Sequence, residues 1–459
     1  MGSAINDIIN KQHKFFNTRT SYDVSYRVAT LKKLKAEIIA KEQAICNALY
    51  ADFKKPVFES LLSETQFVLA ELSTAIKKTR SWAKPKSIWP SLANFPSSDV
   101  IYSEPRGTVL IIAPWNYPFQ LAIAPLIGAV AAGNTVVLKP SELTPHTSKI
   151  ITEIVATVFD QNHVTVVEGG VETSQALLKE KWGYIFFTGS VGVGKIIYKA
   201  AAEHLTPVTL ELGGKNPCII DETVNIKLTA KRIVWGKFLN GGQTCIAPDY
   251  ILIRSKIKEP FIEAMQNEIQ AAYGENPQVS PDYPRIVNEK NFDRLAIMLK
   301  GEETPVGGIV DKEDLYIAPT IVDNPSLDSE VMKDEIFGPI LPVIPYEEIT
   351  AIDLIISHYD KPLSLYVFSK KNSFAKKLIK KYAFGGGAIN DTIVHIVNKR
   401  MPFGGVGHSG IGAYHGKLSF DIFSHKKSVV KRGTWIDIPI RYAPYAKKIN
   451  LAKKIKHLF

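Results

Sequence analysis

The sequence predicts an α/β protein with two domains, each built around a parallel β-sheet. Short apolar stretches alternate with helical stretches from about residue 109 onward, as in strand–helix–strand units. Gly or polar residues follow the apolar stretches, where an open α/β sheet binds its ligand. With 459 residues, 45% of them hydrophobic and 22% charged, the composition is that of a globular protein of about two to four domains.

The predicted elements follow one another in a regular order. The first 80 residues are expected to be helical, most clearly over 28–48 and 59–78. An extended connector then carries Pro85, Pro90, Pro96 and Pro105. Strands are expected at 109–113, 135–138, 164–168, 184–188 and 208–212, with helices at 119–132, 173–179 and 195–204. From about residue 213 to residue 387 the pattern repeats, with helices at 228–239 and 259–273 and strands at 250–253 and 317–322.

One uncharged segment, between Arg106 and Lys139, is long enough to be mistaken for a membrane span. Prolines and amides interrupt it, and each would be costly in lipid: Pro114, Asn116, Pro118, Gln120, Pro125 and Asn134. We therefore interpret the segment as a strand, a polar loop, a buried helix and a second strand.

The net charge of +11 is concentrated at one end of the chain. Residues 426–459 contain ten Lys or Arg and a single acid, Asp437, whereas the preceding residues are nearly neutral. No patch of interleaved basic and aromatic residues accompanies the charge, so the sequence excludes nucleic-acid binding as the main function.

The three cysteines, Cys46, Cys218 and Cys245, are odd in number and far apart. No CxxC or Cys/His cluster indicates a metal or a redox pair, so no metal is predicted and a reducing, cytoplasmic compartment is favoured. The N-terminal residues lack the apolar core of a signal peptide.

A glycine-rich turn at 189–195, GSVGVGK, follows a predicted strand and opens a helix. Its backbone N–H groups and the helix dipole suit a phosphate group. The turn nearly matches a P-loop, but Ile196 stands where the hydroxyl residue should be, and Ile197 breaks the G-x-G-x-x-G pattern. By itself it is equally compatible with a turn that binds nothing.

A second glycine-rich segment, GGQTC at 241–245, ends in Cys245. A thiol in such a loop can be an exposed nucleophile, and nearby backbone N–H groups can polarise a carbonyl. The alternative, a buried and inert cysteine, is the commoner case. Cys46, within a helical AICNALY stretch, and Cys218, before two isoleucines, fit that alternative.

Two further polar residues stand at the ends of predicted strands. Glu211 lies between leucines, where desolvation should raise its pKa towards that of a general base, unless the side chain turns to solvent. Asn116 lies in PWNYP, where its amide could donate to a developing oxyanion; a proline-bounded turn is the alternative.

Together these motifs resemble those of the NAD(P)-dependent aldehyde dehydrogenases. The matching stretches stand in the family's order: APWNYPF (113–119), LKPSELTP (138–145), FFTGSVGVGK (186–195), LELGGKNP (210–217), GGQTC (241–245), DEIFGP (334–339) and MPFGGVGHSG (401–410). The KPSE motif, the segment from residue 401 and the basic end make the chain most similar to the class 3 branch. Members of that branch act on fatty and aromatic aldehydes and are typically dimers.

The resemblance implies a mechanism and assigns residues to it. Cys245 matches the nucleophile that attacks the aldehyde carbonyl to give a thiohemiacetal, and Asn116 matches the oxyanion donor. Hydride transfer to the nicotinamide leaves a thioester, and Glu211 matches the base that activates water to hydrolyse it. The implied reaction converts medium-chain, long-chain or aromatic aldehydes to carboxylic acids.

The resemblance also assigns a cofactor site. Lys139 and Glu142 match positions that face the adenosine ribose. The other matches are Gly189, Ser190 and Gly194 at the pyrophosphate, Trp115 close by, and Glu335 and Phe337 at the nicotinamide ribose and ring. Glu142 should repel a 2′-phosphate and Lys139 should attract one, so use of both NAD and NADP is predicted. One mild departure is Asp334, where the family often has Glu.

The implied fold is that of the aldehyde dehydrogenases. It has a Rossmann-like cofactor-binding domain at 1–210, with 82–106 as an extended oligomerisation arm, and a catalytic domain at 211–400. Residues 401–425 are expected to return to the cofactor domain and the dimer interface, and 426–459 form a basic C-terminal tail.

Other activities stay open at this point. A cysteine hydrolase would cleave esters without a cofactor, although no His lies near GGQTC in the sequence. A non-catalytic binding or structural protein on the same fold would show no turnover. CoA-dependent acylating members of the family commonly lack the hydrolytic Glu, so Glu211 favours release of the free acid.

The segment 445–459, YAKKINLAKKIKHLF, has two interpretations. On a helix, an apolar stripe would form from Ile449, Ala452, Ile455 and Phe459, although Lys448 and Lys456 intrude on it. Such a helix could lie on an anionic membrane surface, where fatty aldehydes partition. The alternative is a solvated basic tail that covers the partner subunit of a homodimer.

Overall fold

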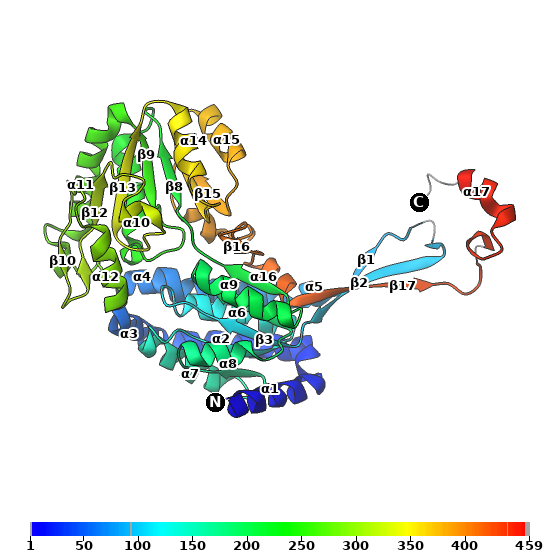
Figure 1. Ribbon diagram of the computed structural model, residues 1–459. Helices are drawn as coiled ribbons and strands as arrows, with labels where there is room; N and C mark the ends of the chain where they lie inside the picture. Colours follow the sequence, from blue (N-terminus) through cyan, green and yellow to red (C-terminus); the bar gives the residue numbers. More distant parts are fainter. Residues whose placement is uncertain (1, 92–93, 438, 455–459) are drawn as a thin grey trace.

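Two six-stranded sheets, one above the other in Figure 1, form the body of the protein. The computed structural model describes residues 2–91, 94–437 and 439–454. One sheet has the order β16-β7-β6-β3-β4-β5, and the other has the order β12-β13-β9-β8-β14-β15. The predicted α/β class with parallel sheets is therefore confirmed.

The first sheet contains the strands that were predicted in the first half of the chain. They are β3 (Thr108–Ile112), β4 (Thr135–Lys139), β5 (Val164–Val166), β6 (Tyr184–Thr188) and β7 (Val208–Glu211). These five strands are parallel, and β16 (Gly410–Ile411) joins β7 in the antiparallel direction, so the chain returns to this sheet late.

Both faces of the first sheet are covered, because alternate residues of its strands enter two different cores. Val109 and Ile111 face a core with α2 (Val24–Ala40), α3 (Glu42–Phe53), α5 (Gln66–Ala83), α6 (Gln120–Ala132) and α7 (Pro145–Val158). Leu110 and Ile112 face a core with α1 (Gly2–Asn17), α8 (Val171–Leu178) and α9 (Val191–Glu203). Every residue of α6 is buried, and no described helix is long and apolar enough to cross a membrane.

The N-terminal helices differ in detail from the two predicted stretches. The first breaks at Lys41, between α2, which packs on α5, α6 and α7, and α3, which packs mainly on α7. The second is divided into α4 (Val57–Ser60), a π-helical turn η2 (Leu61–Thr65) and α5. A π-turn inside a helix often marks a functional site.

The second sheet is parallel throughout. Its strands are β8 (Pro217–Ile220), β9 (Tyr250–Arg254), β12 (Thr320–Asp323), β13 (Ile340–Tyr346), β14 (Ser364–Phe368) and β15 (Gly386–Ile389). One face carries α10 (Ile226–Phe238) and α11 (Lys258–Tyr273), and the other carries α12 (Glu289–Met298), α13 (Glu330–Lys333), α14 (Ile349–Ser357) and α15 (Asn372–Lys381). The strand predicted at 317–322 is two strands, because β11 (Tyr316–Ile317) pairs with β10 (Val310–Asp311) before β12 begins.

A third, antiparallel sheet projects from the body as an arm (Figure 1). It consists of β1 (Lys86–Ile88), β2 (Ser97–Pro105) and β17 (Ser424–Arg432), which follows α16 (Lys417–Ile422). The register of β17 on β2 runs from Ser424 opposite Pro105 to Arg432 opposite Ser97. The proline-marked connector is thus the part of the arm that precedes the first sheet, and the end of the chain supplies the third strand.

Candidate active site

A cavity of about 600 Å³ lies at the carboxyl ends of β3, β6 and β7. Its walls are the segments that follow these strands, at 114–116, 189–192 and 212–215, together with residues from the second sheet's half of the molecule. The predicted residues that line it are Trp115, Asn116, Gly189, Ser190, Glu211, Cys245, Glu335 and Phe337. Three predicted residues, Lys139, Glu142 and Gly194, do not line it.

Cys245 lies at the cavity wall, directly after a turn with left-handed backbone angles. The preceding 3-10 turn η4 (Leu239–Gly242) has left-handed residues at Asn240, Gly241 and Gly242. A Cβ on Gly242 would lie 2.2 Å from the carbonyl oxygen of Gly338, so only glycine fits there. The thiol is partly exposed, whereas Cys46 and Cys218 are buried in the core as predicted.

Asn116 lies beside the loop that carries Cys245. Its side-chain Nδ2 donates to the carbonyl oxygen of Gln243 at 3.0 Å, and Asn240 Nδ2 donates to the carbonyl oxygen of Asn116 at 2.8 Å. A primary amide has two N–H hydrogens, and among the described residues Asn116 Nδ2 donates only to Gln243, so its second hydrogen is available to a ligand in the cavity. The segment is therefore hydrogen-bonded to the turn that precedes Cys245.

Glu211 is the last residue of β7 and is buried, so the alternative of a solvent-facing side chain is wrong. Within the described part of the chain, neither of its carboxyl oxygens has a hydrogen-bond partner. Burial raises the pKa of Glu211 well above its ordinary value. An unpartnered carboxyl at a cavity wall is costly for folding and is available to a ligand or to water.

Burial is also the main influence on the Cys245 thiol, whose pKa it raises, and the carboxyls of Glu335 and Glu211 raise it further. A thiol is nucleophilic as the thiolate. A positive charge brought into the cavity would lower this pKa, because an opposite charge stabilises the ionised form.

The N-terminus of α9 forms one side of the cavity. Ser190 caps the helix through its side-chain oxygen, which accepts a hydrogen bond from the backbone N–H of Val193, and Val191 and Gly192 line the wall. Gly194 has a packing role instead, because its Cβ would lie 2.7 Å from Leu212 Cδ2. The glycine-rich turn thus combines an open helix end with close packing on the strand behind it.

Lys139 and Glu142 form an ion pair next to the end of β4, with 2.7 Å between Lys139 Nζ and Glu142 Oε2. The lysine side chain is 3% exposed and that of the glutamate 40%. Each charge therefore partly neutralises the other, which weakens both the attraction and the repulsion that a 2′-phosphate would meet.

The segment that carries Glu335 is held by a buried pair that the sequence analysis missed. Lys215 Nζ lies 2.8 Å from Asp249 Oδ2 and donates to the carbonyl oxygens of Val331 and Asp334. Asp249 Oδ1 in turn accepts from the backbone N–H of Ile336 at 3.0 Å. The lysine that follows the glycine pair of LELGGK could have suggested this role, but its partners lie far away in the sequence.

Glu335 and Phe337 border the cavity opposite α9. A side chain at Gly213 would collide with the Glu335 carboxyl, so the glycine leaves the space that this carboxyl occupies. Burial, together with Asp249, raises the pKa of Glu335 to about 8. The Phe337 ring stands edge-on to the Trp115 ring with 5.2 Å between centroids. A helix end for phosphates, flat apolar walls and carboxyls for hydroxyl groups fit a dinucleotide.

A further group near the site, Lys237 of α10, is fully buried, and within the described residues its Nζ has no hydrogen-bond partner. Burial lowers its pKa to about 8, against the opposing influence of Asp249. Its position inside a helical stretch gave no sequence signal, because a lysine there is usually solvated.

Comparison with known proteins agrees with this geometry. The model of the aldehyde dehydrogenase family matches residues 2–429. The chain is 47% identical to 4,4'-diaponeurosporen-aldehyde dehydrogenase of Staphylococcus aureus, with 96% of each chain covered. It is 42% identical to the dimeric NADP-preferring aldehyde dehydrogenase of Rattus norvegicus, covering 93% of this chain and 94% of that protein. The solved substrate-bound state of AldH from S. aureus superposes with a TM-score of 0.97 at 46% identity, covering 98% of this chain and 99% of the other.

Proposed function

This chain belongs to the aldehyde dehydrogenase family and oxidises aldehydes with NAD or NADP, and from that premise we propose how its own residues divide the work. Cys245 is the nucleophile, Asn116 the oxyanion donor and Glu211 the base. The observation that carries this assignment is that the three side chains line one cavity. The rival functions, a cysteine hydrolase and a non-catalytic protein on the same fold, do not account for the cofactor-binding walls of that cavity.

The first half of the reaction takes place at Cys245. Its thiolate attacks the aldehyde carbon, and the carbonyl oxygen becomes an oxyanion that accepts hydrogen bonds from Asn116 Nδ2 and the Cys245 backbone N–H. A nicotinamide held beside Glu335 and Phe337 would supply the hydride acceptor. Loss of hydride from the thiohemiacetal carbon leaves a thioester on Cys245.

The second half of the reaction is hydrolysis of the thioester. Glu211 removes a proton from water, the resulting hydroxide attacks the acyl carbon, and the thiolate of Cys245 leaves with the carboxylic acid as product. Burial raises the pKa of Glu211, which makes its carboxylate a stronger base towards the attacking water.

The cofactor is held from two sides. Gly189 and Ser190 at the start of α9 bind the pyrophosphate, with Gly194 holding the helix close and Trp115 beside it. Lys139 and Glu142 face the adenosine ribose, and Glu335 and Phe337 contact the nicotinamide half. The Lys139–Glu142 ion pair supports use of both nucleotides, since neither charge acts alone on a 2′-phosphate.

The substrates are medium-chain, long-chain or aromatic aldehydes. Support comes from the S. aureus relative, which is named for a diaponeurosporen aldehyde. A panel from acetaldehyde to hexadecanal and benzaldehyde, assayed by NAD(P)H absorbance, should show the highest kcat/KM for the apolar members. Cys245→Ala should abolish the activity, and free acid should be the product. Acyl-CoA as the product, or ester cleavage as the main activity of the protein without cofactor, would contradict the assignment.

The enzyme acts as a homodimer assembled through the arm. The rat relative is described as dimeric, and the arm exposes large apolar side chains, including Trp89, which is 95% exposed. Figure 1 shows the arm, with the tail that follows β17, extending away from the body. An exposed sheet edge with apolar side chains is a surface that associates with another chain.

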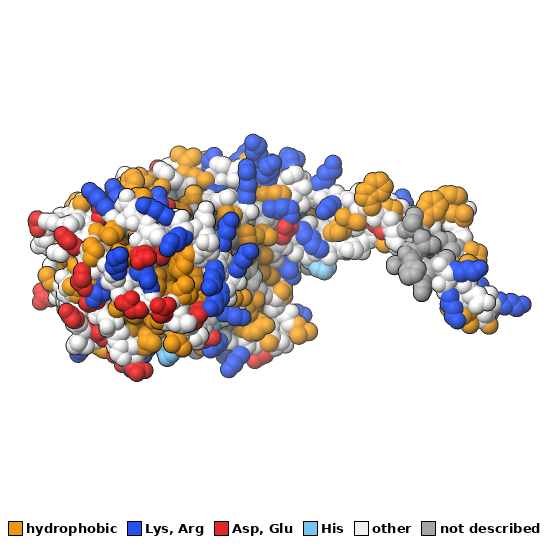
Figure 2. Space-filling view, turned by 90° about the horizontal axis from the view of Figure 1, so that it is seen from above, with side chains coloured by type: hydrophobic (Ala, Val, Ile, Leu, Met, Phe, Trp, Pro, Cys, Tyr) orange, Lys and Arg blue, Asp and Glu red, His pale blue; other side chains and the backbone are white. Residues whose placement is uncertain are grey.

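The basic tail is a candidate for contact with membranes from the cytoplasmic side. Figure 2 shows apolar and basic side chains together at its far end. Helix α17 (Ile449–Lys454) exposes Ile449 and Leu451 next to Lys447, Lys448, Lys453 and Lys454. Two members of the expected stripe, Ile455 and Phe459, lie outside the described residues. An apolar side chain beside lysines is the pattern of a helix on an anionic surface.

Vesicle co-sedimentation tests this second role. The full chain should bind vesicles that contain phosphatidylglycerol and leave phosphatidylcholine vesicles unbound, and a chain ending at Pro444 should bind neither. Equal binding of both chains would reject the tail as an anchor and favour its alternative position on the partner subunit.

A further inference from the structure

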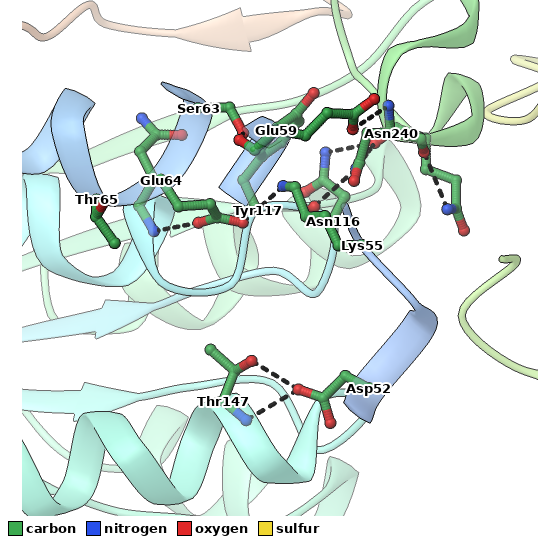
Figure 3. A network of polar contacts seen from close by, with 12 residues as sticks. Asp52, Lys55, Glu59, Ser63, Glu64, Thr65, Asn116, Tyr117, Thr147 and Asn240 are labelled. Atoms are coloured by element: carbon green, nitrogen blue, oxygen red, sulfur yellow. Dashed lines mark hydrogen bonds and ion pairs between the residues drawn. The ribbon is translucent and has the colours of Figure 1, made fainter. Parts of the chain in front are cut away.

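A cluster of three charged side chains, Lys55, Glu59 and Glu64, lies buried behind the catalytic loops (Figure 3). Lys55 Nζ is 2.8 Å from Glu64 Oε1, and both side chains are 0% exposed. Glu59 is 8% exposed. Burial of charges is expensive, and a buried ion pair is often no more stable than apolar side chains of the same size. The cluster therefore calls for an explanation other than stability.

One side of this charged cluster holds the loop that contains Asn116. Lys55 Nζ lies 4.0 Å from the ring centroid of Tyr117, and Glu64 Oε2 accepts from the backbone N–H of Gln120 at the start of α6. The Tyr117 hydroxyl meets Thr244 Oγ1 at 2.7 Å. The carboxylate of Glu64 thus holds the end of the Asn116 loop at α6. The Tyr117 hydroxyl links the same loop to Thr244, the residue before Cys245.

The other side holds the turn that carries Cys245. Glu59 Oε2 accepts from the backbone N–H of Asn240 at 2.9 Å, as Figure 3 shows. Asn240 is the left-handed residue whose Nδ2 donates to the carbonyl oxygens of Asn116 and Gln243. Asn116 Nδ2 donates to that same Gln243 oxygen. A single carboxyl of α4 therefore anchors the bonds that cross-link the two catalytic loops.

We propose that Lys55, Glu59 and Glu64 are positioning residues, which fix the free amide hydrogen of Asn116 relative to Cys245. This rests on the roles proposed above for Asn116 and Cys245. The π-turn η2 belongs to this arrangement, because it lies between Glu59 and α5 and contains Glu64. A displacement of about 1 Å at a catalytic group can lower a rate by about 100-fold.

The test compares Glu59→Leu with Glu59→Gln in the full-length enzyme. Glu59→Gln keeps an acceptor oxygen for the Asn240 N–H, whereas Glu59→Leu leaves that donor unpaired. We expect Glu59→Leu to lower kcat for aldehyde oxidation by about 10- to 100-fold, and Glu59→Gln to restore most of that loss. The rate of Cys245 alkylation by iodoacetamide should change little, because alkylation needs the thiolate but not the oxyanion donor.

Asp52→Asn is the matched control. Asp52 lies on the neighbouring α3 and accepts hydrogen bonds from the backbone of His146 and Thr147, at the start of α7, without contacting either catalytic loop. Its loss should lower thermal stability and leave kcat unchanged. If kcat falls as much in Asp52→Asn as in Glu59→Leu, the charged cluster has only a general structural role and the positioning role is wrong.

The decisive readout is a double-mutant cycle with Asn116→Ala. If Glu59 acts through Asn116, Glu59→Leu has little further effect in the Asn116→Ala background. A full additional loss there overturns the proposal. Should Glu59→Leu fail to fold, Lys55→Met combined with Glu64→Gln removes the ion pair, keeps the acceptor for Gln120, and enters the same cycle. An unchanged kcat in Asn116→Ala alone instead refutes the proposed role of Asn116, and the positioning role with it.

Discussion

At the residue scale, carboxyl groups taken out of water distinguish this enzyme. Glu59 and Glu211 are buried and Glu335 is half-buried at the cavity wall, and burial raises the pKa of each. The pKa of Glu59 rises to about 7 and that of Glu335 to about 8. Because the native state then holds protons that the unfolded chain releases, such groups make the free energy of unfolding depend on pH.

Glu59 should therefore destabilise the enzyme as the pH rises. Below its ordinary pKa of 4.5 both states hold the proton, and the loss of stability is complete once the pH passes the folded value of about 7. Relative to Glu59→Gln, the wild type should lose about 3 kcal/mol of unfolding free energy across this window. Urea denaturation of both proteins at the two ends of the window measures it. A difference that is independent of pH would show that Glu59 keeps its ordinary pKa.

The Lys139–Glu142 pair leads to a prediction about the nucleotide. Wild-type kcat/KM values for NAD and NADP should differ by less than about a thousandfold, or roughly 4 kcal/mol. Glu142→Gln leaves Lys139 without its partner, so kcat/KM for NADP should rise about tenfold relative to that for NAD. Steady-state kinetics with both nucleotides tests both statements. A shift towards NAD in Glu142→Gln would mean that the pair does not face the ribose.

At the scale of single elements, the turn η4 decides where Cys245, the proposed nucleophile, lies. Gly242 has a φ of 72°, and a Cβ there would meet backbone atoms of Gly338, which cannot move aside as a flexible side chain could. Three successive left-handed residues turn the chain so that the thiol faces the cavity. The turn is thus specified by backbone geometry rather than by side-chain contacts.

Gly242→Ala should consequently disturb the site more than a strained backbone alone explains. Gly274 is the control, since it also has a positive φ, of 81°, but a Cβ there meets nothing within 4 Å. Gly274→Ala should cost about 1 to 3 kcal/mol and leave activity intact, whereas Gly242→Ala should cost more and abolish aldehyde oxidation. Thermal melting and kcat of both variants decide between them. Equal melting temperatures of the two variants would show that the backbone of Gly338 shifts to make room for the new Cβ.

At the scale of the whole molecule, the arm joins distant parts of the chain. Strand β2 precedes the strands of the first sheet and β17 is the last described strand of the chain, yet the two pair along their full length. Gly433 extends the pairing by donating its N–H to the carbonyl oxygen of Pro96. Without β17, the only partner of β2 within the described chain would be the short strand β1.

Truncation tests whether the arm forms the dimer. A chain ending at Gly433 keeps β17 and should sediment as a dimer, like the full protein. A chain ending at Phe423 lacks β17 and should sediment as a monomer, because β1 and β2 alone should not keep the structure of the arm. A dimer from both chains would place the interface elsewhere on the body.

Much of the half of the molecule that is built on the first sheet could be predicted from the sequence. The strands around β3 and β6 are continuous apolar runs because helices cover both faces of the sheet, and such runs stand out from their polar surroundings. Cys245, Asn116 and Glu211 could be named because each lies in a short motif at a strand end or a glycine turn. Local chemistry alone left an alternative open for each residue, and only the order of all the motifs, which resembles that of the family, implied their roles.

Only the tertiary structure revealed the residues that hold the site in place. Lys55 and Glu64 lie in helical segments where a charge is usually solvated, and Lys215 finds Asp249 only once the second sheet has formed. Domain folding brings their partners together across long stretches of chain, and burial then changes their pKa values and energetic roles. The sequence by itself determined the chemistry of the reacting groups. The tertiary structure decided their positions, because burial and long-range pairing are properties of packing rather than of spacing.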